Sequence, residues 1–531
     1  MFGPFACDDE FGSRAINPLE LYHNQITRAQ GPFSLRMHHR SWGLMLIQAN
    51  IAAPSTLLDF PTRERFIDEL RSRHYDVVGI SGIVMNIGKV REMCRLVRRH
   101  SPRSTIVVGG HVTALPGVER IIDADHVVKG EGVRWMREFL GEPVDTAVVH
   151  PLIRSSFGFR LMGIAAPRGG GDPAATIIPS VGCPMGCNFC STSAFFGGKG
   201  RFVNFYETGA ALFEVMSEVE ARLRVRTFFM MDENFLLYKK RALELLELMK
   251  AHGKSWSLSV FSSANALRKY TMRQLVELGI SWVWMGLESA QATYAKLRDS
   301  DTLALTRDLQ SHGIHVQGST IIGLEHHTAA NLPSEIEHAV AHDADCHQFM
   351  LYTPVPGTPL YAETVRSGHL LSDVDLADIH GQYKFNFRHP HIGRDESSGW
   401  LERAFQRDYE ANGPSLYRIM RTTYRGWARY RHDADARVRA RFAREGSKLR
   451  NGYGAALWAM EMFLRRSQAE VSLRIRALRR QIEDEFAGLT PLIDRVAGRV
   501  LLHAARREFS RYPLGRPLEP MTFVDRRNWL P

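Results

Sequence analysis

The 531-residue sequence contains few cysteines and no long apolar run. Six cysteines in a chain of this length are too few for a disulfide framework. No stretch of about 18 or more apolar residues is present, which excludes a membrane-spanning helix. The first ten residues are acidic and contain no apolar segment. We therefore expect no signal peptide and a cytoplasmic, oxygen-sensitive protein.

A nucleotide-binding phosphate loop is also missing. No Gly-x4-Gly-Lys-Ser/Thr sequence occurs, so binding of nucleoside triphosphates is unsupported. Internal repeats and low-complexity runs are absent as well. The length implies two to four domains. A hydrophobic content of 44% and a charged content of 24% are ordinary for a soluble globular protein.

Negative charge is scarce at one end of the chain. From residue 411 onward there are 25 Lys plus Arg against 12 Asp plus Glu. This excess of 13 positive charges is larger than the net charge of the whole chain, which is +11. The rest of the chain is therefore close to neutral. A basic region favours a nucleic acid, a membrane surface or an acidic substrate as partner. The alternative is a solvated helical face without a partner.

Three of the six cysteines stand close together. Cys183, Cys187 and Cys190 form a Cys-x3-Cys-x2-Cys run, whereas the other three, Cys7, Cys94 and Cys346, are dispersed. A structural zinc site would need a further ligand pair, and structural sites close with four ligands. Three thiolates on one loop instead favour a [4Fe–4S] cluster whose fourth iron is open to a substrate or cofactor.

The N-terminal part alternates strands and helices. After an extension over residues 1–40, a domain over residues 41–150 shows apolar runs separated by helical patterns. We predict strands over 44–49, 76–81, 105–110 and 126–132, and helices over 63–73 and 90–100. Strands that are apolar throughout favour a doubly wound, Rossmann-like parallel sheet. Ligands of such sheets bind at the carboxyl ends of the strands. The small residues there are Ser81, Gly82, Gly109 and Gly110.

A second domain follows a glycine-rich linker over residues 151–175. It spans residues 176–370 and contains six β/α units, which predicts a partial (β/α)6 TIM-like barrel with its chemistry at the strand ends. The predicted strands cover residues 175–180, 226–231, 256–261, 282–287, 315–322 and 348–352. Polar and glycine residues follow three of them: Asp232, Glu233 and Asn234 after the second, Glu288 and Ser289 after the fourth, and Gly323 after the fifth.

The last part, residues 371–531, has helical periods and no strand pattern. We predict helices over 401–418, 434–450, 455–466 and 471–486, which form a basic helical C-terminal domain. The stretch over 454–466 is strongly apolar with a basic end. It fits either the core of this domain or an amphipathic surface at a membrane interface.

The cysteine run, with Phe189 just before the third cysteine, resembles the signature of the radical S-adenosylmethionine (radical SAM) superfamily. The resemblance implies that the open iron binds the amino and carboxylate groups of S-adenosylmethionine (SAM), and that an electron from the cluster yields a 5′-deoxyadenosyl radical. It also implies that Asp232, Glu233 and Asn234, with Glu288, Ser289 and Gly323, contact SAM. Carboxylates suit the SAM ammonium group because it needs acceptors.

The N-terminal domain resembles the cobalamin-binding domain that precedes the barrel in one radical SAM subclass. The matching runs are 79–82, 107–111 and 128–132, which add His111, Gly130 and Glu131 to the candidate cobalamin contacts. The Asp-x-His-x-x-Gly motif, whose histidine ligates cobalt in other cobalamin proteins, is absent. Many members of the subclass lack it and hold the cofactor without a histidine ligand.

These resemblances together imply a class B radical SAM methyltransferase that methylates an unactivated carbon. The alternatives are cyclisation, coupling or rearrangement by the same cofactors, or a cobalamin or SAM sensor without catalysis. A tRNA methylthiotransferase, and nucleic acid as partner, are disfavoured because no second group of three cysteines exists. The expected partners are a small-molecule or lipid-like substrate, an electron donor such as flavodoxin or ferredoxin, and peripheral membrane contact through the basic region. No catalytic acid or base is assigned.

Overall fold

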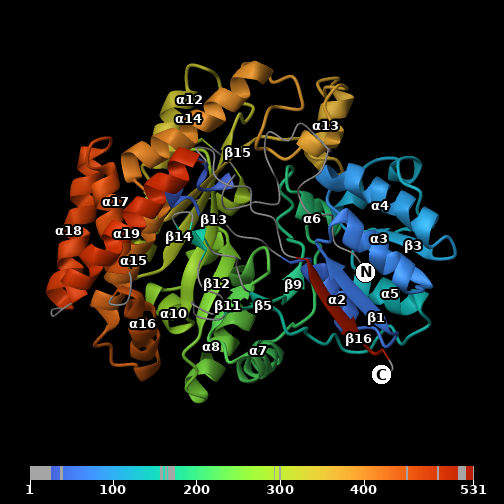
Figure 1. Cartoon of the computed structure of the whole chain (residues 1–531), viewed down its shortest axis with the longest axis horizontal. Helices are drawn as coiled ribbons and strands as arrows, with labels where there is room; N and C mark the ends of the chain where they lie inside the picture. The colour runs from blue at the N-terminus through green and yellow to red at the C-terminus, as the bar shows by residue number, and fades with distance from the viewer. Residues whose placement is uncertain are drawn as a thin grey trace.

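The computed structural model describes residues 25–35, 40–155, 160–161, 164–165, 174–291, 294–297, 300–449, 453–486, 490–511 and 522–529. Figure 1 shows an N-terminal α/β domain in blue beside a central sheet in green and yellow, with helices in orange and red on the opposite flank. The observed architecture is therefore the predicted α/β fold with an N-terminal sheet, a partial barrel and C-terminal helices. Cys7 and the glycine-rich run over 166–173 lie outside the described residues.

The N-terminal domain is built on three parallel strands in the order β2-β3-β4. Their apolar side chains pack with α3 and α4 into one core. The strands and helices of this domain are α2 (Trp42–Ala49), β1 (Ser55–Asp59), α3 (Arg63–Ser72), β2 (Val77–Ser81), η2 (Val84–Asn86), α4 (Ile87–His100), β3 (Thr105–Gly109), η3 (His111–Ala114), η4 (Val118–Arg120), β4 (His126–Val127) and α5 (Gly132–Phe139).

Two of the predicted elements in this domain are wrong. The apolar run over 44–49, predicted as a strand, is the helix α2. A short apolar run does not distinguish a buried strand from a buried helix, because neither leaves a polar face to set a period. The strand predicted over 126–132 ends at Val127, since Gly130 has a positive φ of 88° and Glu131 caps α5.

The barrel sheet contains the six predicted parallel strands in the order β15-β14-β13-β12-β11-β8. A seventh strand, β5, pairs antiparallel with β8 and lies within the stretch predicted as linker. The strands are β5 (Arg154–Ser155), β8 (Ala174–Ile177), β11 (Thr227–Met230), β12 (Ser257–Ser262), β13 (Ile280–Glu288), β14 (His315–Ile322) and β15 (Cys346–Leu351). Short pairs outside it are β9 (Ser180–Val181) with β10 (Val203–Asn204), and β6 (Arg160–Leu161) with β7 (Ile164–Ala165).

One apolar core joins this sheet to α7 (Gly209–Leu223), η5 (Phe235–Leu237), α8 (Lys239–Ala251), α9 (Ala264–Leu267), α10 (Met272–Glu277) and α11 (Thr302–Ser311). A second core joins β14 and β15 to α12 (Leu332–Val340) and α13 (Pro359–Arg366). The short helices between these elements are α6 (Ser191–Phe195), η6 (Ala295–Leu297) and η7 (Leu376–Asp378). Because all six parallel strands point the same way, their carboxyl ends meet at one edge, where the site is expected.

The C-terminal region is helical, with three differences from the prediction, the first of which is a helix over Thr490–Arg511 that was not predicted. The helix predicted over 401–418 is broken at Gly413, whose φ is 77°, and at Pro414. A strand, β16, pairs antiparallel with β1 although no strand was predicted there. The elements are α14 (Arg394–Asn412), α15 (Ser415–Tyr430), α16 (Ala436–Lys448), α17 (Gly454–Leu464), α18 (Ala469–Glu485), α19 (Thr490–Arg511) and β16 (Phe523–Arg527).

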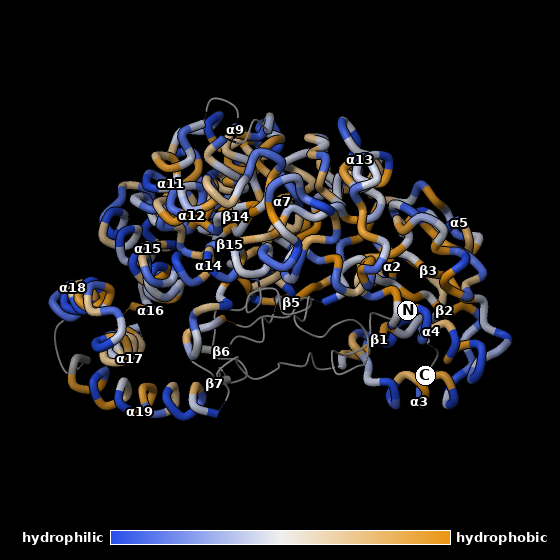
Figure 2. The backbone as a smooth tube through the Cα atoms, turned by 90° about the horizontal axis from the view of Figure 1, so that it is seen from above, coloured by the Kyte–Doolittle hydropathy of each residue, from blue (hydrophilic) through white to orange (hydrophobic). Residues whose placement is uncertain are grey.

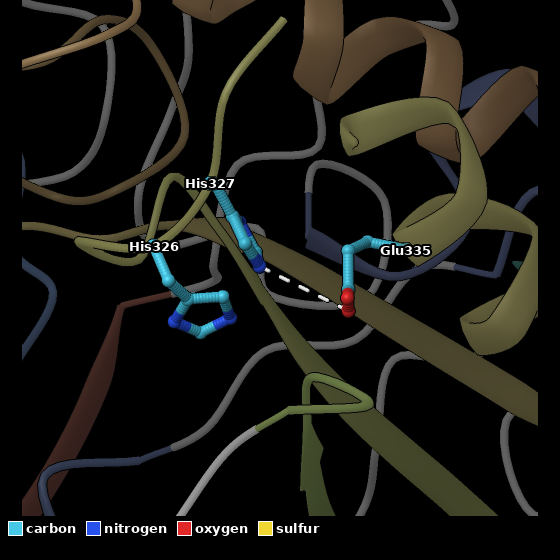
Figure 3. Close-up of side chains that lie close together, drawn as sticks. All are labelled: His326, His327 and Glu335. Atoms are coloured by element: carbon cyan, nitrogen blue, oxygen red, sulfur yellow. Dashed lines mark ion pairs between the residues drawn. The ribbon is translucent and has the colours of Figure 1, made fainter. Parts of the chain in front are cut away.

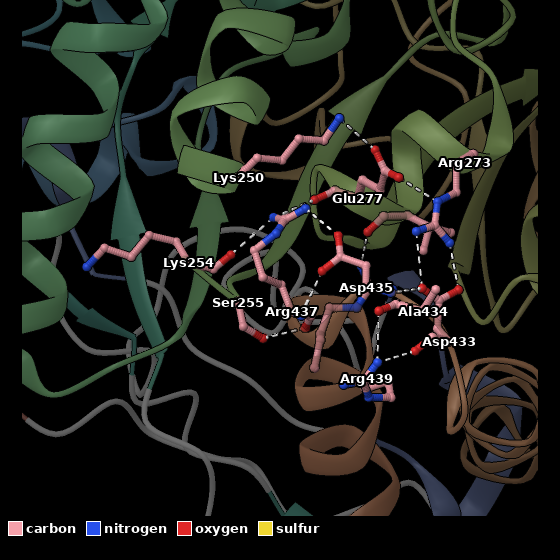
Figure 4. A network of polar contacts seen from close by, with 12 residues as sticks. Lys250, Lys254, Ser255, Arg273, Glu277, Asp433, Ala434, Asp435, Arg437 and Arg439 are labelled. Atoms are coloured by element: carbon pink, nitrogen blue, oxygen red, sulfur yellow. Dashed lines mark hydrogen bonds and ion pairs between the residues drawn. The ribbon is translucent and has the colours of Figure 1, made fainter. Parts of the chain in front are cut away.

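A network of polar contacts fastens this region to the bottom of the barrel (Figure 4). Arg273 of α10 binds Asp433 with two hydrogen bonds of 2.6 and 3.1 Å. Arg437 of α16 donates to the carbonyl of Glu277, and its own carbonyl accepts from Ser255. These residues precede β12 and β13, so this part of the helical region docks at the amino ends of the strands.

The described part of the N-terminal extension packs on the helical region. Phe33, in η1 (Arg28–Phe33), is fully buried and contacts the ring of Phe463 edge-on at 5.0 Å. Gln30 exchanges hydrogen bonds with Ser415. Burying a side chain of this size contributes about 1.5–3 kcal/mol. This segment therefore stabilises the contact between the chain's beginning and its helices.

Candidate active site

The three cysteines lie on the loop that follows β8 and β9, at the carboxyl edge of the barrel. Gly182 and Gly186 have φ values of 88° and 67°, and a Cβ at Gly186 would lie 2.8 Å from the Lys199 backbone. The Cys190 thiol caps α6, and Ser193 donates to the carbonyl of Cys183 at 2.7 Å. Glycines at the tight turns and the α6 cap thus shape the loop so that all three thiols line one cavity.

The donor set fits a cluster better than a single zinc ion. The three sulfur atoms do not gather within 4.8 Å of one another. Four thiolates around one zinc, at bonds of about 2.3 Å, would bring the sulfurs to about 3.8 Å. Burial raises the pKa of the Cys183 thiol to about 11, with the other two thiols adding to the shift. A bound metal centre would remove this penalty because it binds the thiolate.

The cavity has a volume of about 630 Å³ and joins two domains. Its N-terminal side is formed by residues that follow β2 and β3: Ile83, Val84, Met85, His111 and Ala114. Its barrel side contains the cluster cysteines and strand-end residues. A ligand at the cysteine loop therefore lies in the same space as a ligand over the ends of β2 and β3.

Glu233 is the carboxylate of this cavity without a cationic partner among the described residues. Its Oε2 atom is buried and has no hydrogen-bond partner there, while the backbone of Gly182 hydrogen-bonds to the carboxylate. Burial and the charge of Asp232 together raise the pKa of the Glu233 carboxyl to about 7. A buried, unpaired carboxylate is costly unless a cation meets it. Glu233 therefore offers a place for an ammonium group beside the cysteine loop.

Two other predicted SAM contacts are occupied by structural bonds. Asp232 is 1% exposed, does not line the cavity, and pairs with Arg241 at 2.5 Å. Asn234 reaches the cavity wall, but its amide binds the backbone and side chain of Ser263 at the end of β12. These two residues hold the ends of β11 and β12 together around Glu233.

Glu288 and Phe189 lie in the cavity together with a lysine that the sequence did not suggest. Lys296 forms an ion pair with Glu288, and its ammonium lies 5.2 Å from the centre of the Phe189 ring. Burial lowers the pKa of Lys296, but the charges of Glu288 and Cys187 outweigh this effect and keep the pKa above its ordinary value. Lys296 lies in a short 3-10 turn outside every motif, so no sequence signal marked it.

Ser289 and Gly323, also predicted SAM contacts, do not line the cavity. The Ser289 hydroxyl donates to Glu335 of α12 at 2.7 Å. Gly323 has a φ of 83°, and a Cβ there would collide with the ring of Phe385. Both residues shape the strand ends behind the cavity.

The predicted cobalamin contacts divide into open positions and packed ones. A Cβ at Gly109 or Gly130 would meet nothing within 4 Å. A Cβ at Gly82 would collide with Val90, and one at Gly110 would collide with the backbone of Gly82. Open backbone at the ends of β3 and β4 lets a large flat ligand approach closely. The Glu131 carboxylate caps α5 and is therefore not free for a ligand. The Ser81 hydroxyl lies beside Gly110, where an added Cβ would meet it at 2.9 Å.

His111 lines the cavity and stacks on Phe195 of α6, with ring centres 4.5 Å apart. Burial lowers its pKa to about 4, so the ring is neutral at pH 7. Its Nε2 atom is buried and lacks a partner among the described residues. An orphaned, neutral imidazole at the end of β3 fits a domain that holds a cofactor at this edge.

The barrel wall above the cluster contains residues that sequence reasoning missed. Trp284 stacks on Phe261, with centres 4.9 Å apart, and donates to Ser319 at 2.7 Å. Ser319 donates in turn to Gln348. Alternation along β12 to β15 could have marked these side chains as facing inward, but it does not indicate which of them border a cavity.

A cavity lined by three cysteines of one loop, at the carboxyl edge of a partial β/α barrel, defines an enzyme of the radical SAM type. Residues 177–338 match the radical SAM superfamily model, and residues 43–140 match the B12 binding domain model. The chain belongs to the radical SAM superfamily and, within it, to the proteins that carry a B12-binding domain. The predicted family is confirmed.

The chain is similar to known methyltransferases and to a solved structure. The chain is 25% identical to an uncharacterized methyltransferase of Pyrococcus horikoshii, over 56% of this chain and 71% of the relative. It is 24% identical to bacteriochlorophyllide d C-8(2)-methyltransferase of Chlorobaculum tepidum, over 61% and 75%. The structure of TsrM from Kitasatospora setae, a methyltransferase with cobalamin and a [4Fe-4S] cluster bound, aligns with a TM-score of 0.51 at 16% identity, over 84% and 98%.

Filling the open space at Gly109 tests where cobalamin binds. Gly109→Val is expected to reduce the cobalamin retained after reconstitution severalfold, because its side chain enters the space that the corrin ring would occupy. Bound iron should not change. Gly43→Val, at another open position on the surface of α2, is the control. Wild-type cobalamin content in Gly109→Val, measured by absorbance after gel filtration, would place the cofactor elsewhere.

Proposed function

We propose that this enzyme transfers a methyl group to a carbon atom of a small molecule, with a [4Fe–4S] cluster, SAM and cobalamin as cofactors. The observation that carries the proposal is the single cavity of about 630 Å³ that joins the cysteine loop to the ends of β2 and β3. When bound, the cluster and SAM supply a carbon-centred radical, and cobalamin supplies the methyl group. Six relatives are named methyltransferases or methylases, which supports methyl transfer. Two are named cyclases, so cyclisation is the second candidate.

The chain's own residues would hold these groups as follows. Cys183, Cys187 and Cys190 would bind three irons and leave the fourth open. Glu233 would accept the SAM ammonium, and Lys296, which is paired with Glu288, would offer a cation to the SAM carboxylate. The apolar residues after β2 and His111 after β3 would face the corrin ring. The two domains then place both cofactors against one substrate, which the reaction requires because a radical must meet its partner at short range.

The cavity also favours an uncharged substrate. Its charged residues, Glu233, Glu288 and Lys296, lie around the cysteine loop. Away from that loop, the wall formed by Trp284, Ser319 and Gln348 is neutral and already paired. A charged substrate group there would lose its hydration without gaining a partner. The substrate class proposed is therefore a neutral, largely apolar molecule.

Anaerobic reconstitution tests the methyl-transfer proposal. The loaded protein is incubated with reductant, a flavodoxin or ferredoxin as electron donor, methyl-labelled SAM and extracts of uncharged metabolites. A product heavier than its substrate by one CH₂ unit and carrying the label supports methyl transfer. A product of unchanged carbon count, formed with 5′-deoxyadenosine, would assign cyclisation or coupling instead. Absence of SAM cleavage under strong reductant would favour the sensor.

Three thiols that must stay reduced support the cytoplasm as location.

We also propose that α19 binds the surface of an anionic membrane. Four apolar side chains of its first turns, Leu492, Ile493, Val496 and Val500, are 56–66% exposed. Their spacing places them on one stripe, and the exposed Arg495 and Arg499 flank it. Figure 2 shows α19 at the border of the molecule. An apolar stripe beside cations is the pattern of a helix that lies in a lipid interface. In the described residues no helix is long and apolar enough to span a bilayer.

Vesicle flotation tests this contact. The wild-type protein is expected to float with vesicles of phosphatidylglycerol and phosphatidylcholine, and much less with phosphatidylcholine alone. Arg495→Gln with Arg499→Gln should weaken binding about 30-fold, at about 1 kcal/mol for each cation. Val496→Ser with Val500→Ser should weaken it as well, while Leu473→Ser on the exposed face of α18 should not. Equal binding to both vesicle types, or self-association without flotation, would refute the membrane contact.

A further inference from the structure

A buried polar network lies behind the SAM side of the cavity (Figure 3). It consists of Ser289, His326, His327 and Glu335 and is called the Ser289 network here. His327 and Glu335 are 0% and 5% exposed. Ser289 follows β13, the two histidines follow β14, and Glu335 belongs to α12. The network therefore joins the ends of two neighbouring barrel strands to the helix outside them.

The two histidines and the glutamate resemble a metal site, since one ligand atom of each lies within 4.8 Å of the others. The hydrogen bonds argue against a metal. The Ser289 hydroxyl occupies the centre of the group, 2.7 Å from Glu335 Oε2, 3.1 Å from His326 Nε2 and 3.3 Å from His327 Nε2. A metal with ligand bonds of about 2.0–2.2 Å would need this same space.

The protonation of His327 leads to the same conclusion. Its Nδ1 atom accepts from the backbone N–H of Gly323 at 3.0 Å and of Leu324 at 3.3 Å. A neutral imidazole that accepts at one nitrogen carries its proton on the other. Burial and the neighbouring His326 lower the pKa of His327 to about 4, so the ring is neutral at pH 7. Nε2 is therefore a donor, which excludes it as a metal ligand.

The groups around the Ser289 hydroxyl then have consistent roles, with His326 Nε2 donating to it as well. His327 Nε2 donates to Ser289, and the single hydroxyl proton of Ser289 is donated to Glu335. The same carboxylate oxygen accepts from the N–H of Ala290 at 2.9 Å. One imidazole thus binds the backbone turn after β14 on one side and the residue after Glu288 on the other. Glu288 and Ile321, the neighbours of these turns, both line the cavity.

We propose that His327 is a positioning residue for SAM: it fixes the ends of β13 and β14 relative to each other and thereby sets the place of Glu288 in the cavity. The proposal rests on the assignment of this cavity to SAM. Glu288 has a φ of 58°, an uncommon conformation for a residue with a side chain. A strained residue keeps its conformation only when its surroundings determine it, and the Ser289 network supplies bonds on the adjacent residues.

Two substitutions separate the halves of the His327 side chain. His327→Asn keeps an acceptor near the position of Nδ1 and loses the donor to Ser289. His327→Gln keeps a donor near the position of Nε2 and loses the acceptor for Gly323 and Leu324. Each loss removes one buried hydrogen bond or more, which predicts an affinity for S-adenosylhomocysteine weakened about tenfold. Ser289→Ala should weaken it similarly, and combined with His327→Asn should add little, because the two residues share one bond.

The experiment measures binding of S-adenosylhomocysteine to the iron-loaded protein by calorimetry and exchange of backbone amides by mass spectrometry. Exchange in peptides that cover residues 321–328 should accelerate in His327→Gln and much less in His327→Asn. His342→Asn is the matched control, since His342 is also buried and neutral but lies at the other end of α12, bound to Thr302. It should lower thermal stability without changing affinity or exchange at 321–328.

The outcomes are distinguishable. Wild-type affinity in both His327 variants, with only a loss of stability like that of His342→Asn, would overturn the positioning role. If the wild type retained one equivalent of metal in addition to its cluster iron, and His327→Gln did not retain it, the group would be a metal site and not a hydrogen-bonded network. If the wild type does not bind S-adenosylhomocysteine at all while exchange still separates the two variants, the SAM assignment fails and the tie between the strand ends stands.

Discussion

Cys187→Ala is expected to abolish both iron binding and SAM cleavage. Cys187 is the middle ligand of the loop, and the described residues offer no fourth thiol near it, because Cys94 and Cys346 are buried in other parts of the fold. Two thiolates cannot hold three irons. The reconstituted variant should lack the broad absorbance of a cluster and form no 5′-deoxyadenosine above background.

Cys94→Ala provides the control for this result. Cys94 is fully buried in α4 against the N-terminal sheet, so its substitution should lower stability moderately and leave iron content unchanged. Retention of wild-type iron and SAM cleavage by Cys187→Ala would refute the cluster assignment. Equal loss of iron in both variants would show that iron reports on folding and not on ligation.

Adjacent carboxylates, Asp232 and Glu233, are expected to respond in opposite ways. Glu233→Gln should weaken binding of S-adenosylhomocysteine about 100-fold, since it removes one partner of a buried charge pair, worth about 2–5 kcal/mol. Its melting temperature should change little, because Oε2 has no partner to lose among the described residues and the amide oxygen of Gln can still accept from the backbone of Gly182. Calorimetric titration of the iron-loaded variant measures the first effect and a thermal scan the second.

Asp232→Asn should show the reverse. Asp232 and Arg241 are each 2% exposed in their side chains, and breaking a buried pair costs about 3–5 kcal/mol, because a charge is left without a partner. The melting temperature should therefore fall clearly, while the affinity of the folded fraction changes little. Glu325→Gln, on the exposed turn after β14, should change neither. If Glu233→Gln were destabilised but bound S-adenosylhomocysteine normally, Glu233 would have the structural role assigned here to Asp232.

The cysteine loop and the six strands could be predicted because their signals are local. The spacing of Cys183, Cys187 and Cys190 is a property of one short run, and apolar β/α alternation marks each strand. The strand ends were therefore located as well. Which side chain at a strand end faces the cavity could not be predicted. Asp232 and Glu233 are neighbours with the same charge, and only the position of Arg241 on α8 decides which one is neutralised.

Residues brought in by tertiary contacts carried no signal. Lys296 enters the cavity from a 3-10 turn whose sequence contains no motif. Ser289 does not line the cavity, and its hydroxyl donates a hydrogen bond to Glu335 of α12. The helix α2 was predicted as a strand since its short run is apolar without a period. The strand β16 was missed because a peripheral strand of alternating exposure has little apolar content, and its partner is far away in the sequence.

The pairing of β16 with β1 has a consequence for synthesis and maturation. Residues 523–527 cover an edge of the N-terminal domain, and Arg526 reaches the buried carboxylate of Glu69 at 2.7 Å. The red strand beside the blue domain in Figure 1 thus joins two segments that lie far apart in the sequence. On the ribosome, β1 emerges early but has no partner strand until residues 523–527 have been translated. This edge of the N-terminal domain can therefore be completed only after the barrel and the helical region have been synthesised.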